Sequence, residues 1–139
     1  MRILLSLLIV LVCGLVACTT PGEGELKNEP LTIRGSVSYA EKVALTADSV
    51  LVVELNEVNS HGEIKGIVSK TRIVNPGQVP IPFEINIPAG EVRNVKHYGV
   101  NARVEHDGRV LFDQQEPYPV LTYGFSTVAN VQLRMVNAQ

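Results

Sequence analysis

The sequence has little cysteine, no long uninterrupted hydrophobic span and no excess of basic residues. Its two cysteines, Cys13 and Cys18, both lie in the first 18 residues. The hydrophobic run that begins at Ile3 ends before Thr19, and a transmembrane helix needs roughly 20 apolar residues. The 139 residues include 12 Lys and Arg against 14 Asp and Glu, a net charge of −2. We therefore expect neither a retained membrane span at the start nor a nucleic-acid partner, which calls for a basic patch or stripe.

Residues 1–17 are typical of a signal peptide, with Arg2 ahead of the hydrophobic segment and small residues before the cut. The residues at the cut, Leu15-Val16-Ala17-Cys18, are similar to the bacterial lipobox. In that motif the thiol takes up a diacylglyceryl group as a thioether, and the small preceding residue lets the protease approach the bond. Cys18 is therefore the predicted lipidation site, and its covalent lipid, such as palmitate, the only attached group expected. A plain signal peptide with a chance cysteine is the alternative, and Cys13 is a weaker candidate because no small residue precedes it.

Cleavage before Cys18 leaves 122 residues, one domain by length, with a net charge of −3 once Arg2 is removed. No disulfide is then available, because Cys13 leaves with the signal and Cys18 carries lipid. One acyl chain binds a membrane reversibly, whereas two or more anchor a protein stably. Thr19 follows Cys18, where lipoproteins kept on the inner membrane of diderm bacteria carry Asp. The expected location is the outer membrane, facing the periplasm.

The remaining chain divides into a tether and one domain. Residues 18–30 are mostly polar, with one large apolar residue, Leu26, and are expected to form a flexible tether. In residues 31–139, apolar and polar residues alternate with period two, and Pro and Gly clusters interrupt the pattern. Gly66 suggests a bulge and Asp107-Gly108 a tight hairpin turn. The alternation predicts strands at residues 31–39, 49–58, 64–74, 81–87, 95–106, 109–113, 117–122 and 128–136.

Seven or eight short strands without a convincing helix predict an all-β fold, an antiparallel β-sandwich or barrel of immunoglobulin size, with the sandwich as the expected form. Pro82 places the start of its strand at an edge or at the first ladder position. Pro117 and Pro119 bracket Tyr118 and make residues 117–122 a short edge strand or an extended segment. Tyr118 and Tyr123 belong to a late group of aromatic residues that could line a binding surface, although capping of the core is the favoured explanation for the group. Pro82, Tyr118 and Tyr123 are therefore the candidate partner-binding residues.

Patterns that carry catalysis are scarce in this sequence. The three histidines, His61, His97 and His106, have no second ligand at metal-site spacing. Glu54 and Glu57 would point to opposite faces of a strand, which separates them. No nucleophile elbow and no phosphate-binding glycine loop is found. The sequence therefore predicts no catalytic, cofactor or metal site, and we do not expect an enzyme.

Three stretches resemble the YbaY-like lipoprotein domain, which is grouped with the YscW-type pilotins of type III secretion. They are Gly35-Ser36-Val37-Ser38-Tyr39, the segment Pro76 to Ile85, and Tyr98-Gly99-Val100-Asn101-Ala102-Arg103-Val104. The resemblance covers about residues 33–136. It implies a small β-sandwich lipoprotein without known catalysis. In the pilotin branch, the lipoprotein binds a C-terminal segment of a secretin, carries it to the outer membrane and promotes ring assembly.

The expected function is that of a non-enzymatic, membrane-anchored chaperone for a secretin or another envelope protein. The partner would add as an extended segment to an edge near Pro82 or Tyr118, or lie as an amphipathic helix in an apolar cleft. The alternative is a structural or glycan-associated envelope lipoprotein without a secretion role. The matched residues mostly specify the fold, so they do not separate these alternatives or fix the oligomeric state.

Overall fold

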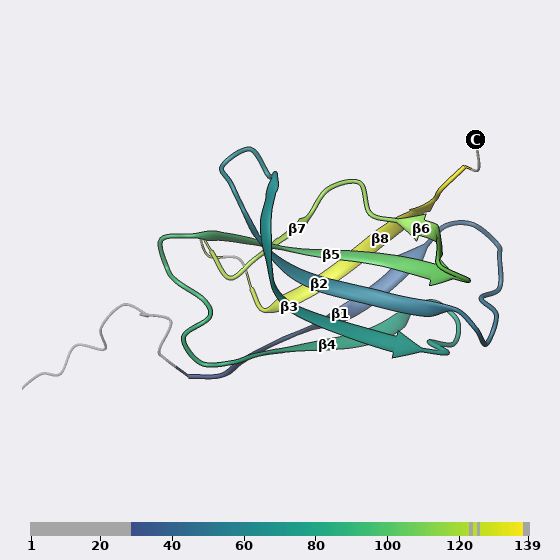
Figure 1. Ribbon diagram of the computed structural model, residues 1–139, viewed down its shortest axis with the longest axis horizontal. Helices are drawn as coiled ribbons and strands as arrows, with labels where there is room; N and C mark the ends of the chain where they lie inside the picture. Colours follow the sequence, from purple (N-terminus) through teal and green to yellow (C-terminus); the bar gives the residue numbers. More distant parts are fainter. Residues whose placement is uncertain (1–28, 123, 125, 138–139) are drawn as a thin grey trace, which may run out of the picture.

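The computed structural model describes residues 29–122, 124 and 126–137, which form eight strands (Figure 1). These residues contain no helix, and so no helix that could cross a membrane. Cys18 and Tyr123 lie outside the described residues. The strands are β1 (Leu31–Tyr39), β2 (Val50–Val58), β3 (Ile64–Val74), β4 (Ile81–Ile87), β5 (His97–His106), β6 (Arg109–Asp113), β7 (Tyr118–Val120) and β8 (Val128–Met135).

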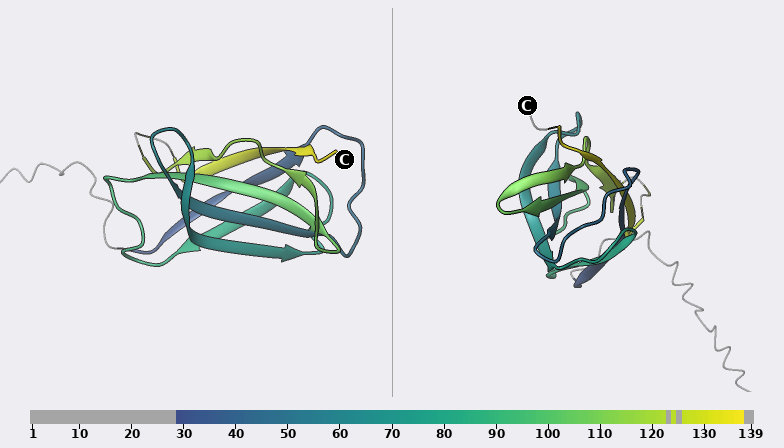
Figure 2. Two further views of the ribbon diagram at one scale, coloured as in Figure 1. Left: turned by 45° about the horizontal axis from the view of Figure 1, so that its top comes forward. Right: turned by 90° about the vertical axis from the view of Figure 1, so that its right-hand side faces the viewer.

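The strands form one sheet in the order β3-β2-β5-β6-β8-β1-β4, with β7 paired to β5 off this path. Seen end-on, the sheet curls around a central core (Figure 2). The all-β class and the strand number agree with the prediction, but the arrangement is a nearly closed, barrel-like sheet rather than two separate layers. Two residue pairs between β6 and β8 join what would otherwise be separate sheets. In addition, β1 and β8 run parallel, so the sheet is not wholly antiparallel.

Period-two alternation places one face of each strand in the core. In β4, Ile81, Phe83, Ile85 and Ile87 are buried and the residues between them are exposed. β2 differs, because its residues 51–56 are buried without interruption. This strand lies between β3 and β5, as expected for a central strand. Alternation in residues 128–136 would place Met135 on the inward face with Leu133, but Met135 is 40% exposed where the strand leaves the core.

Most of the late aromatic residues that the structure describes belong to the core. Phe112 and Tyr98 are each 1% exposed. The Phe112 ring stacks on Tyr39, with a centroid distance of 4.1 Å. Tyr118 lies on the surface and is 36% exposed. Packing of the core therefore explains Phe112 and Tyr98, in agreement with the prediction that the late aromatic residues cap the core.

The two ends of the sheet, β3 and β4, meet without a backbone ladder. Ser69 Oγ donates a hydrogen bond to the Asn86 carbonyl at 2.9 Å, and Thr71 Oγ1 donates to the Glu84 carbonyl at 2.9 Å. β4 pairs along its other edge with β1, so the edge position predicted from Pro82 is correct. Side-chain hydroxyls thus close the barrel over a short length of this seam, and the seam is open beyond them.

Candidate functional site

The sequence-predicted partner-binding residues do not come together in one site. Pro82 is exposed on β4 and lies opposite Ser36 of β1. Tyr118 lies on β7 and faces Val100 of β5. Strands β2 and β3, or β6, β8 and β1, separate β5 from β4 in the sheet order. A hollow of about 330 Å³ beside β7 is lined by neighbours of Tyr118, including Pro119 and Thr122.

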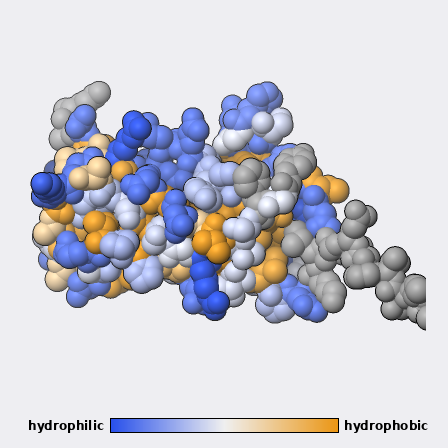
Figure 3. Space-filling view, turned by 180° about the vertical axis from the view of Figure 1, so that it is seen from behind, coloured by the Kyte–Doolittle hydropathy of each residue, from blue (hydrophilic) through white to orange (hydrophobic). Residues whose placement is uncertain are grey.

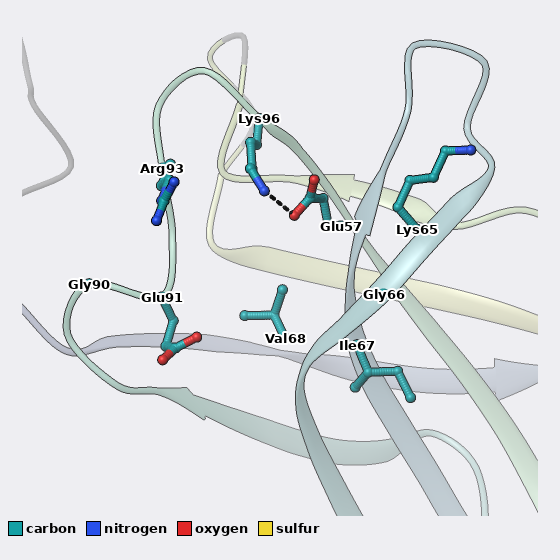
Figure 4. Close-up of a pocket in the computed structure, with 9 residues that line it drawn as sticks. All are labelled: Glu57, Lys65, Gly66, Ile67, Val68, Gly90, Glu91, Arg93 and Lys96. Carbon is teal, nitrogen blue, oxygen red and sulfur yellow. Dashed lines mark hydrogen bonds and ion pairs between the residues drawn. The ribbon is translucent and has the colours of Figure 1, made fainter.

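A charged hollow lies where the seam between β3 and β4 opens (Figure 4). This cleft of about 430 Å³ has one wall from the N-terminal half of β3 and the other from the connection between β4 and β5. Five of its lining residues are charged and two are apolar. We call it the β3 cleft, and its lining consists of Glu57, Lys65, Gly66, Ile67, Val68, Gly90, Glu91, Arg93 and Lys96.

Two bulges shape the strand wall. The register between β2 and β3 shifts twice. The ladder skips Val68 at the first shift and Lys65 at the second, so neither residue has a partner on β2. The bulge predicted at Gly66 is therefore present as two irregularities, one on each side of that glycine. Bulges increase local twist and turn an edge away from its neighbour. Residues 64–67 are consequently exposed, and Ile67 is 58% exposed.

The loop wall, residues 88–96, is fixed to the core. The buried hydroxyl of Tyr98 accepts a hydrogen bond from the Arg93 amide at 2.9 Å. Val92 packs against the core cluster. Gly90 has a φ of 84°, a left-handed conformation that glycine adopts without strain. These contacts hold the loop backbone opposite β3, and the exposed side chains of Glu91 and Arg93 extend from it.

Charges in the β3 cleft are only partly neutralised. Lys96 Nζ lies 2.6 Å from Glu57 Oε2, and these side chains are 37% and 32% exposed. Lys65 lies 3.7 Å from Glu63, with both side chains more than half exposed, a geometry that contributes little. Glu91 and Arg93 form no ion pair with the described part of the chain. Cations exceed anions by one among the lining residues.

The outer face of β3, β2 and β5 carries a continuous charge network beyond the cleft. Glu54 accepts from Lys70 at 3.0 Å and from Arg103 at 3.2 Å. Arg103 also contacts Glu105 at 2.7 Å, and Arg72 lies 3.6 Å from Glu105. The hydrogen bond from Arg103 lowers the pKa of Glu105 below its ordinary value, although partial burial opposes the shift. The network fixes the C-terminal half of β3 to its neighbours.

Sequence reasoning missed the charged residues of the β3 cleft. The glycine signal at Gly66 indicated a bulge in β3, but nothing near it in the sequence indicates that this part of β3 and residues 88–96 form the two walls of a cleft. Glu57 pairs with Lys96 and Glu54 with Lys70 and Arg103, so these two glutamates serve separate clusters. Within the described residues, no group of three or more His, Cys, Asp or Glu is placed to hold a metal ion.

Residues 28–133 match the model of the family described as "Type III secretion system lipoprotein chaperone (YscW)". The chain therefore belongs to the YscW family, which confirms the YscW part of the resemblance. No curated protein matches the chain.

A solved structure is similar over its whole length. It is described as an alternative pilotin from the type II secretion system of Vibrio cholerae. The two sequences are 28% identical, and the match covers 79% of this chain and 100% of the pilotin, with a TM-score of 0.73. A secretion pilotin thus has the same curled sheet.

Proposed function

We propose that this chain is a pilotin-type lipoprotein of the outer membrane that binds a secretin subunit and aids its localisation or assembly, without enzymatic activity. Membership of the lipoprotein chaperone family carries the proposal. The similarity to a solved pilotin over that protein's entire length supports it. The mature chain begins, in this proposal, at a lipid-modified Cys18 and faces the periplasm.

Lipid attachment gives the proposed chaperone its place of work. Two or more acyl chains hold a protein stably at a bilayer. The 13 residues from Cys18 to Pro30 span at most about 45 Å when extended, so the domain stays close to the membrane. Leu31, where the domain begins, is paired with Ile87 at the end of β4. The loop wall of the β3 cleft starts just after Ile87, at the end of the sheet where β1 begins (Figure 1). In this proposal the cleft therefore lies near the attachment of the tether.

The proposal is tested in a strain that lacks this gene and carries either the wild-type chain or Cys18→Ser. Labelled palmitate should enter only the wild-type protein, and only that protein should fractionate with outer membranes. Outer-membrane secretin multimers, measured by immunoblot after membrane separation, should fall several-fold in the deletion strain and recover with the wild-type chain alone.

The two parts of the proposal fail separately. Absence of label from the wild-type chain would refute lipidation at Cys18. Secretin multimers that are unchanged in the deletion strain would refute the chaperone function, and would favour a structural or glycan-associated envelope role instead.

A further inference from the structure

The N-terminal half of β3 has an open edge inside the β3 cleft. β3 pairs with β2 along one edge. Its other edge is joined to β4 through Ser69 and Thr71, and the described residues show no such bond for residues 64–68. Unpaired strand edges present rows of backbone donors and acceptors and readily accept another strand. In this molecule, such an edge faces a fixed loop rather than open solvent.

The lining of the β3 cleft favours an extended occupant over a helix. An amphipathic helix binds through a broad apolar groove, whereas only Ile67 and Val68 are apolar among the lining residues. From the side opposite to the view of Figure 1, hydrophobic atoms form separate strips between hydrophilic ones (Figure 3). That side therefore offers no broad apolar groove either. A strand added to β3 would instead use backbone hydrogen bonds and alternate side chains.

The charges of the cleft specify the occupant further. Lys96 and Glu57 neutralise each other, and Lys65 is only weakly paired with Glu63, at 3.7 Å. The Arg93 backbone is held by the hydrogen bond from its amide to Tyr98, and its exposed guanidinium forms no ion pair in the described part of the chain. A planar guanidinium suits a carboxylate, which it binds through two parallel hydrogen bonds.

Exposed apolar residues flank the same cleft. Val95 in the loop is 87% exposed, and Ile67 and Ile64 on β3 are 58% and 49% exposed. Several exposed apolar side chains in one place mark an interaction surface more often than scattered ones do. They provide contacts for the apolar side chains of an incoming segment.

We infer that the β3 cleft binds an extended, acidic segment of the secretin partner, which adds as a strand to residues 64–68 and places a carboxylate against Arg93. The inference rests on the proposed function and names its binding site. The β3 edge supplies backbone hydrogen bonds and the loop wall supplies the selection for negative charge.

Backbone amide exchange locates the binding. The full chain with Cys18→Ser, which prevents lipidation, is mixed with a synthetic peptide that covers the C-terminal segment of the secretin. Hydrogen exchange measured by NMR should slow at residues 64–68 and remain unchanged in the β5–β6 hairpin at the far end. Protection confined to other strands would overturn the inference. Equal protection by anionic lipid vesicles, or by raised protein concentration without peptide, would also overturn it, because the occupant would then be a membrane or a second copy.

Charge reversal tests the role of Arg93. Arg93→Glu should weaken peptide binding by about tenfold, the effect expected from loss of one charge-assisted contact. Arg109→Glu makes the same change in net charge on an exposed residue at the far end, and should bind as the wild type does. When each acidic residue of the peptide is replaced in turn by lysine, one of these peptides should recover binding to the Arg93→Glu variant. Equal affinities for the two variants would overturn the proposed contact.

Methylation of peptide amides tests strand addition without altering the protein. Each N-methyl group removes one backbone donor, so in a paired strand only alternate positions should lose affinity. Loss at every position, or at none, would contradict strand addition. If the deletion strain shows that the secretin depends on this chain while Arg93→Glu and the methylated peptides bind normally, the inference fails and the proposed function stands.

Discussion

In β3, residues 69–72 are bonded to β2, to β4 over a short length and to a charge network on one face, whereas residues 64–68 are bonded along one edge only. Ser69 and Thr71 join the first group to β4. Lys70 and Arg72 join it to the charge network of β2 and β5. Residues 64–68 have two bulges in place of these contacts. The contrast shows that one strand can close a barrel at one end and open a binding cleft at the other.

The largest expected effect on stability comes from removing Glu54, the centre of the charge network. Glu54 is 8% exposed and pairs with both Lys70 and Arg103. Glu54→Ala leaves Lys70 without its ion-pair partner and Arg103 with Glu105 alone, so we expect a loss of about 2 kcal/mol in the free energy of unfolding, below the 3–5 kcal/mol typical of fully buried pairs. Urea titration measures the change.

Glu84→Ala is the matched control for Glu54→Ala. The pair of Arg34 and Glu84 has side chains that are 70% and 52% exposed, and its removal should change stability by less than about 0.5 kcal/mol. Equal losses in the two variants would mean that the network does not hold β3.

A smaller effect is expected where hydroxyls close the seam. The double variant Ser69→Ala, Thr71→Val removes both bonds to the β4 carbonyls and should cost about 1 kcal/mol, because the groups lie near solvent. Hydrogen exchange should accelerate in residues 69–71 until they resemble residues 64–68. The control Thr32→Val, Ser36→Ala removes hydroxyls on β1, whose backbone is paired on both sides, and should leave the exchange of β3 unchanged. Unchanged exchange in both variants would show that the hydroxyls do not close the barrel.

Residues 64–68 of β3, which line the open cleft, should tolerate an added side chain. A Cβ at Gly66 meets nothing within 4 Å, so Gly66→Ala should stabilise the protein by about 0.5 kcal/mol through lower chain entropy in the unfolded state. Gly35→Ala should do the opposite, because its Cβ would lie 1.7 Å from the Ala129 carbonyl oxygen. Thermal unfolding measures both variants. A destabilising Gly66→Ala would show that this wall of the cleft is packed rather than open.

Local patterns in the sequence predicted the strands well. Alternation located β4 to the residue, and Asp107-Gly108 forms the predicted hairpin turn with φ of 48° and 72°. Such features depend on neighbours in the chain. The glycines of the family motif have a physical reason that only the structure reveals, since Gly35 lies against Ala129 and Gly99 against Pro117.

Long-range contacts explain what the sequence could not predict. The parallel pairing of β1 with β8 joins residues about 94 positions apart, and no local pattern encodes it. Strand alternation is also the same in a sandwich and in a curled sheet, because both bury one face of each strand. The β3 cleft depends on a loop that meets β3 only after the sheet has curled, so its charged residues could not be recognised as a group.

The smallest expected effect is a pH dependence of stability that arises from Glu105. Hydrogen bonding by Arg103 lowers the pKa of Glu105 from the ordinary 4.5. A carboxylate whose pKa is lower in the folded state contributes stability above its unfolded pKa, and this contribution disappears as pH falls through the folded pKa. We therefore expect urea titrations between about pH 7 and about pH 3 to show less loss of stability in Glu105→Gln than in the wild type. At low pH, amide protection from hydrogen exchange should fall in residues 69–74, which the network holds. It should not change in residues 64–68, which already lack these contacts. An undiminished pH dependence in Glu105→Gln would place the acid-sensitive group elsewhere and remove Glu105 from the contacts that distinguish the two halves of β3.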